Sequence, residues 1–211
     1  MIQFRLFGIP VSVHPVFWLT LALLGGALSG ISTKAELLKL ALFVLAGFIS
    51  VLVHEMGHAL TIRHYKLPTQ IVLQAFGGFA THPAGVLNRL QSFLVTAAGP
   101  AIQILLGLGA LAVLLYAPLP KTLIQDFLFF LFWVSIIWAV LNCFPIYPLD
   151  GGRMLESILG PRRIRAVFIT GLVTAALLGL AAVALSEPIL AIFMGLFAWE
   201  NYKNLQQHRP F

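Results

Sequence analysis

The chain has 211 residues, of which 60% are hydrophobic and only 9% are charged. Soluble domains carry roughly a quarter charged residues, so this composition excludes an ordinary soluble protein and predicts one embedded in membrane lipid. The formal charge of +6 comes from residues scattered between apolar segments, which argues against a nucleic-acid partner. The single cysteine, Cys143, excludes an internal disulfide framework and a cysteine-rich zinc site.

Apolar stretches along the chain predict about six helices, most of them near the roughly 20 residues that a bilayer-spanning helix needs. The predicted ranges are 14–30, 36–63, 90–117, 124–142, 163–185 and 188–205. Only Ser186, Glu187 and Pro188 separate the last two, and a proline suits the first turn of a new helix. The predicted fold class is an all-α polytopic membrane protein, with residues 1–211 forming a single integral membrane domain.

The lysines and arginines predict the orientation of these helices, because they are enriched in cytoplasmic loops. With six spans and a cytoplasmic N-terminus, ten of the 13 basic residues fall on the cytoplasmic side. The other three are Lys34, Lys39 and Lys121. We therefore expect a multi-pass protein of a prokaryotic-type cell membrane with both termini in the cytoplasm. The ends of the second and fourth helices then lie on the same side.

The segment between the second and third predicted helices, KLPTQIVLQAFGGFATHPAG, is too short and too rich in Pro and Gly to span as a helix. Residues 69–74 partly alternate between polar and apolar, and Gly77 with Gly78 is a turn signal. These features predict a β-like hairpin that re-enters the membrane, where it must be buried in protein or line a wet cavity. A surface loop with a short interfacial helix is the alternative.

The second predicted helix contains the run HEMGH, which places three ionisable side chains in a stretch otherwise suited to lipid. His54 and His58 are four residues apart, so both imidazoles share a helical face and can reach one metal ion. Glu55 is adjacent and is suited to accept a proton from water at that ion. The pattern predicts a zinc site for hydrolysis; the alternative is that the three residues only form hydrogen bonds within the helix bundle.

A catalytic zinc ion usually takes three protein ligands, so a carboxylate is expected to join the two histidines. Asp150 is the best-placed candidate. In NCFPIYPLDGGR two prolines end the fourth predicted helix, and Gly151 with Gly152 lets the backbone turn sharply. Position alone leaves Glu156 and Glu200 open as ligands, and Asp150 could instead cap the following helix.

Two motifs give the chain a family resemblance. HEMGH matches H-E-x-x-H, and NCFPIYPLDG matches N-x-x-P-x-x-x-L-D-G at Asn142, Pro145, Leu149, Asp150 and Gly151. In these motifs the chain resembles the site-2 protease family of intramembrane metalloproteases, most closely its small branch of sporulation-factor-processing peptidases. Weaker similarities at GIPVSVHP and AAGP extend the resemblance over essentially the whole chain.

The resemblance implies one catalytic Zn²⁺ bound by His54, His58 and Asp150, with Glu55 as general base. It also implies that Asn142 holds the substrate backbone or the oxyanion. The family often has Asn three residues after the proline of its AGP motif, whereas this chain has Gln103. The longer amide argues against a fine positioning role there. No PDZ-like or CBS-like domain fits in the remaining residues.

The expected activity is hydrolysis of peptide bonds within or near transmembrane segments of membrane proteins, in contact with membrane lipid. The extended segment that includes Gly77 and Gly78 is expected to bind substrate by β-strand addition. A membrane zinc transporter is the main alternative, but the other predicted helices offer almost no further ligands along a path. A non-catalytic relative would usually have lost Glu55 or a metal ligand.

Overall fold

The computed structural model describes residues 1–28, 30–75, 77–117 and 123–208. The chain divides into two compact units, Met1–Val86 with Ala98–Ala139, and Leu87–Ala97 with Val140–Phe211. The single domain over residues 1–211 stays a prediction. Ser29, Lys121 and Arg209, which the predicted helices and topology include, lie outside the described residues.

The first unit contains a four-stranded sheet in the order β1-β2-β3-β4. The strands are β1 (Ile2–Leu6), β2 (Ile9–Val13), β3 (Gln70–Gln74) and β4 (Gly77–Thr81). β1 pairs with β2 and β3 with β4 in antiparallel fashion, whereas β2 and β3 run parallel. Every second residue of β2 is buried, as expected for a strand with one face on a core.

This sheet changes two of the predictions from sequence. The all-α class omitted it, because the N-terminal hairpin of β1 and β2 was not predicted. The segment after the second helix does form antiparallel strands, but Gly77 and Gly78 belong to β4 and are not its turn. A glycine signals a turn only where the backbone needs its freedom, and here Gly78 is needed for a close contact described below. Re-entry of the hairpin into a membrane stays a prediction.

Two helices of the first unit begin at well-formed caps. α1 (Pro15–Leu24) starts with Pro at its first position, and Nδ1 of His14 accepts a bond from the amide of Val16. α2 (Lys34–His64) starts at a capping box in which Thr33 and Glu36 bond reciprocally to each other's backbone amides. α1 ends six residues earlier than predicted, where Gly25 and Gly26 follow and Gly26 has a φ of +91°.

The two following helices are α3 (Arg89–Tyr116) and α4 (Leu123–Cys143). Within the first unit they pack with α2 around the buried residues Ala46, Ala110 and Leu131. A second cluster joins the sheet, α1 and α2, with Ile9, Val11, Val13, Phe17, Val51, Ile71 and Leu73 among its buried members. The middle of α2 thus lies between the sheet and the other helices of its unit.

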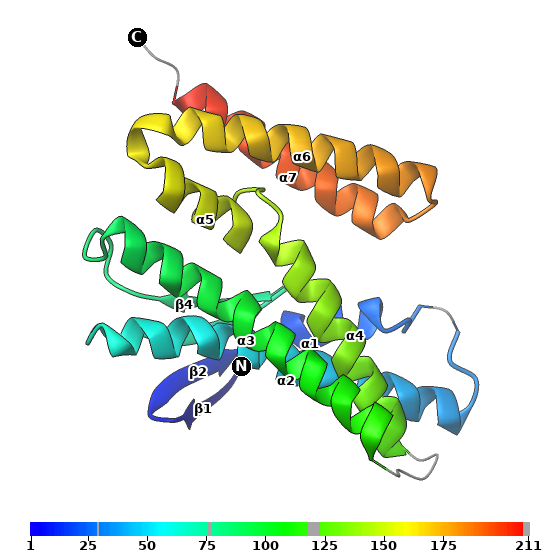
Figure 1. Cartoon of the computed structure of the whole chain (residues 1–211). Coiled ribbons are helices and arrows are strands. Elements are labelled where there is room, and N and C mark those ends of the chain that lie inside the picture. The colour runs from blue at the N-terminus through cyan, green and yellow to red at the C-terminus, as the bar shows by residue number, and fades with distance from the viewer. Residues whose placement is uncertain (29, 76, 118–122, 209–211) are drawn as a thin grey trace. The chain divides into compact units, whose positions relative to one another are not determined.

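The second unit contains α5 (Asp150–Leu159), a 3₁₀ turn (Pro161–Arg163), α6 (Ile164–Ala184) and α7 (Pro188–Gln207). α6 and α7 lie side by side (Figure 1) and enclose a core around Ile146, Ala175 and Met194. The predicted break between them is confirmed, with Pro188 as the first residue of α7. α5 was not among the predicted helices, because its Gly-rich start suggested a turn.

Among the described residues, four helices are long and apolar enough to cross a membrane: Lys34–His64, Arg89–Tyr116, Leu123–Cys143 and Pro161–Ala184. The ten residues of α1 span about 15 Å, half of a hydrocarbon core of roughly 30 Å. The chain is thus a mostly helical, multi-pass membrane protein with a small sheet. A count of six spans stays a prediction.

Close packing of α6 on α7 gives a test of the second unit. A Cβ at Gly171 would lie 2.3 Å from Oδ1 of Asn201, whereas a Cβ at Gly195 would meet nothing within 4 Å. We expect Gly171→Ala to lower the free energy of unfolding by about 1–3 kcal/mol through overpacking. Gly195→Ala, the same change on α7, should leave it unchanged or slightly raised. Thermal unfolding in detergent compares the two, and equal midpoints would contradict this packing.

Candidate metal centre

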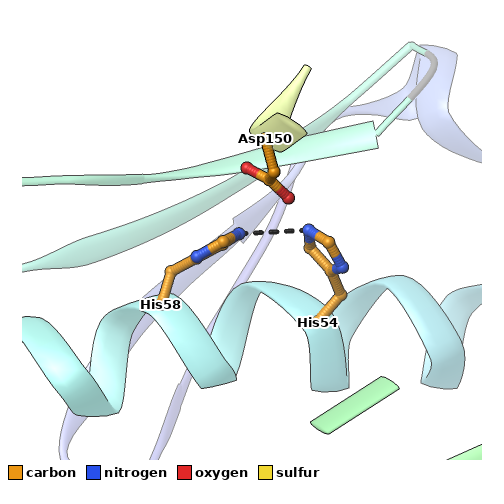
Figure 2. Close-up of side chains that lie close together, drawn as sticks. All are labelled: His54, His58 and Asp150. Atoms are coloured by element: carbon orange, nitrogen blue, oxygen red, sulfur yellow. Dashed lines mark hydrogen bonds between the residues drawn. The ribbon is translucent and has the colours of Figure 1, made fainter. Parts of the chain in front are cut away.

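The spacing of the two histidines on α2 brings their imidazoles together. Nε2 of His54 and Nε2 of His58 are 3.1 Å apart, and Figure 2 shows both rings rising from the same face of the helix. Their exposed fractions are 3% and 8%. Two nitrogens that converge at this distance in a buried position are suited to share a cation.

Two glycines let α3 approach this face of α2. A Cβ at Gly99 would lie 2.3 Å from Nε2 of His58, and a Cβ at Gly57 would lie 2.6 Å from the carbonyl oxygen of Ala98. Real Cβ atoms are not found at such distances, so any larger residue would displace the imidazole or separate the helices. The backbone of α3 therefore forms a wall of the centre.

Glu55 is buried beside β4. Its exposed fraction is 4%, and a Cβ at Gly78 would lie 2.8 Å from Cγ of Glu55 and 2.6 Å from Cδ2 of Leu73. The absence of a side chain at Gly78 thus allows the strand to pass directly against the glutamate. This close approach is the reason for a glycine inside β4.

Gln103 of α3 contacts His54 from another helix. Its side chain is fully buried, and its Oε1 lies 2.8 Å from Nδ1 of His54. Its Nε2 lies 2.8 Å from Oγ of Ser50, which is 2.9 Å from Oγ of Ser135 on α4. From the sequence, a positioning role was not expected for Gln103, and no role was predicted for Ser50 or Ser135. The signal available was polar side chains within long apolar helices.

Asp150 belongs to the second unit, where it is the first residue of α5. The start of α5 packs against the end of α4: a Cβ at Gly151 would lie 2.2 Å from the carbonyl oxygens of Cys143 and Phe144. A Cβ at Gly152 would lie 2.5 Å from the amide nitrogen of Tyr147. These glycines were predicted to provide a sharp turn. They are instead helical residues that must be small because backbone passes close to them.

The loop before Asp150 is held by two side chains that the sequence argument also missed. Nδ2 of Asn201, buried in α7, donates to the carbonyl oxygens of Tyr147 and Phe197 at 2.5 and 2.8 Å. Nε of Arg153 donates to the carbonyl oxygen of Pro148 at 3.2 Å. An asparagine in an apolar helix was again the available signal.

His54, His58 and Asp150 form a group that could hold a metal ion. One ligand atom from each lies within 4.8 Å of the others, and the three side chains are those drawn in Figure 2. Within the described part of the chain, Glu156 and Glu200 do not belong to this group. Asn142 is a half-buried residue in the last turn of α4.

Comparison with known proteins agrees with these features. The model of peptidase family M50 matches residues 117–186, which include Asp150 but not the two histidines. A Synechocystis protein provisionally named a zinc metalloprotease is 34% identical over 164 residues, covering 73% of this chain and 42% of that protein. Stage IV sporulation protein FB of Bacillus subtilis is 29% identical, covering 94% of this chain and 67% of its own length.

Two further matches, one in sequence and one in structure, come from Methanocaldococcus jannaschii. The sequence match, a protein named a zinc metalloprotease, is 26% identical, and the chain covers 57% of its length. The chain thus spans about half the length of this relative and of the Synechocystis protein. The structural match is the solved structure of a site-2 protease, and the alignment covers 100% of this chain and 96% of that protein's chain. The TM-score is 0.67 and the sequence identity is 23%. That likeness shows the fold. In sequence, the chain is thus similar to peptidase family M50 and to proteins named zinc metalloproteases, and in fold it is similar to a site-2 protease.

Proposed function

We propose that the chain is an intramembrane zinc metalloprotease that hydrolyses peptide bonds within or near transmembrane segments of membrane proteins. The observation that carries the proposal is the buried pair of histidines, with Nε2 atoms 3.1 Å apart, on a helix long and apolar enough to cross a membrane. Relatives named as zinc metalloproteases support both the ion and the reaction.

The chemistry of the donor atoms fits one zinc ion. Zinc binds His nitrogens at about 2.0–2.1 Å, so two such ligands in a tetrahedral site lie roughly 3.3 Å apart, close to the separation of the two Nε2 atoms. Asp150 supplies a carboxylate as the proposed third ligand, which makes the His₂-carboxylate set typical of catalytic zinc with one open position. Zinc in such a site supplies a Lewis acid that acidifies water and polarises a carbonyl.

Glu55 is the proposed general base. Its carboxylate follows His54 directly in the sequence and is buried, which suits it to accept a proton from the attacking water. The same carboxyl group then delivers that proton to the amine that leaves. Because Gly78 lies against Glu55, a substrate near this strand is near the base.

Substrate is proposed to bind as an added strand on β4. This strand is the last in the sheet order, so no described strand pairs with its outer edge. An extended peptide can bond to such an edge through its backbone, which explains how a helical segment, once unwound, is presented for hydrolysis. Gly77 and Gly78 contribute backbone here, and Asn142 is proposed to hold the substrate from the end of α4. The proposed topology keeps both termini in the cytoplasm.

The first test removes the proposed base. Glu55→Gln keeps the size and burial of the side chain but cannot accept a proton, so cleavage should fall by about 10²–10⁴-fold. The measurement is cleavage of a transmembrane peptide co-reconstituted with the protein in liposomes, alongside zinc content by elemental analysis. Zinc content should equal that of the parent protein. Full cleavage by this variant would refute the assignment of the base.

A second test concerns the third ligand. Asp150→Asn removes a charged ligand of the metal. Loss of a residue that only hydrogen-bonds to a ligand typically lowers metal affinity by about 10–100-fold, so this change should lower zinc affinity by more than that. Glu156→Gln and Glu200→Gln make the same kind of change at the carboxylates that sequence position left open. Both should retain one zinc per chain. Loss of zinc from either control, with Asp150→Asn unaffected, would reassign the ligand.

The wall formed by α3 gives a third test. Gly99→Ala places a methyl group where the ring of His58 lies, so the imidazole must move and zinc content should drop. Gly109→Ala is the matched control on the same helix, since a Cβ there meets nothing within 4 Å. Zinc is measured after dialysis against a weak chelator. If both variants hold zinc like the parent, His58 is not a ligand in the position described.

A further inference from the structure

We propose that Gln103 is a positioning residue that fixes the tautomer and orientation of His54, so that Nε2 of His54 faces the metal. The inference rests on the proposed zinc site but concerns a residue that does not itself bind the ion. It also reverses the expectation that a longer amide at this place has no fine positioning role.

The contacts of Gln103 define the orientation of its amide. The oxygen and nitrogen of a glutamine amide are told apart by their partners. Its Nε2 lies 3.4 Å from the backbone carbonyl oxygen of Ser50 and 2.8 Å from Oγ of the same residue. A carbonyl oxygen only accepts hydrogen bonds, so the NH₂ group must be the one that faces Ser50. Oε1 then faces Nδ1 of His54.

This orientation determines the state of His54. An amide oxygen only accepts, so at 2.8 Å the Nδ1 of His54 must be the donor and carry a hydrogen. A neutral imidazole protonated on Nδ1 has its lone pair on Nε2, which is the atom 3.1 Å from Nε2 of His58. Metal-binding histidines usually donate their other nitrogen to an oxygen in this way.

The network continues beyond Gln103 and is held on three helices. Oγ of Ser50 accepts from the amide, so its own hydrogen is free to be donated to Oγ of Ser135 at 2.9 Å. All three side chains are fully buried. Buried polar groups are costly unless bonded, and here each satisfies the next. Gln103 is thereby fixed between α2 and α4 and cannot turn away from His54 without leaving a buried hydroxyl or amide unpaired.

The length of the side chain suits this bridge. An asparagine at position 103 would be one methylene shorter and would draw the amide back toward α3. It could not keep both the 2.8 Å contact to His54 and the 2.8 Å contact to Ser50. We therefore infer that in this chain the geometry of α3 and the longer amide are matched to each other.

The experiment measures the zinc affinity of the purified 211-residue chain in detergent, by competition with a chelator. Gln103→Leu removes the acceptor at similar volume and should weaken zinc binding by about 10–100-fold. Gln103→Glu restores an oxygen acceptor for Nδ1 and should recover most of that loss. Gln91→Leu makes the same change on α3 at a residue that bonds to Asn88 instead, and it should bind zinc like the parent.

A spectroscopic readout distinguishes positioning from a general loss of structure. In metal-free protein with ¹⁵N-labelled histidine, the His54 ring should be in the Nδ1–H form in the parent and lose that preference in Gln103→Leu. If Gln103→Leu does not fold, as judged by size-exclusion and thermal unfolding, Gln103→Asn provides the same comparison and should show the same loss. An unchanged zinc affinity and an unchanged His54 tautomer in the folded variant would overturn the proposal.

These readouts are independent of proteolysis. A parent chain that binds zinc but cleaves no membrane peptide would refute the proposed protease function and leave the assignment of Gln103 standing. Conversely, an active protease in which Gln103→Leu affects neither zinc affinity nor the tautomer would refute the role of Gln103 alone.

Discussion

Burial of ionisable groups in an apolar helix is the constraint on which the first unit depends. Such groups destabilise a membrane helix unless partners satisfy them, and α2 carries His54, Glu55 and His58 within five residues. Part of the compensation comes from another helix, through Gln103 of α3. The polar network therefore does more than serve a metal. It gives α3 and α4 a specific contact with α2 that apolar side chains, which pack equally well on lipid, do not provide.

Small residues make these contacts possible. Gly57 and Gly99 bring the backbones of α2 and α3 together, and Gly78 brings β4 to Glu55. Without a strong hydrophobic drive between helices in lipid, close backbone approach is a main source of packing energy. The same glycines leave the imidazoles and the carboxylate little freedom to move. The close packing of the helices and the fixed position of the side chains in the centre thus both result from these glycines.

The sequence predicted what is local and missed what is not. HEMGH fixes the face shared by His54 and His58 through helical spacing alone, and Pro188 marks the start of α7 because proline suits a first turn. The sheet was missed in part because β2 and β3 pair across a long stretch of chain. The alternation of buried and more exposed residues along β2 was also hard to recognise in a chain in which 60% of residues are hydrophobic. Asn201 and Gln103 were visible as polar residues in apolar helices, but their partners were not.

The position of the sheet beside α2 bears on how a protease could act on a helical segment. Amides in a helix are bonded within the helix, so a substrate must be extended before any bond is attacked. β4 offers backbone groups for an extended peptide, and the glycine at its second position lies against Glu55. In the proposed mechanism, strand addition and proton transfer would involve adjacent atoms of one unit. A side chain at position 78 would push β4 away from Glu55. This close contact accounts for a glycine at a strand position where a larger residue would otherwise strengthen the strand.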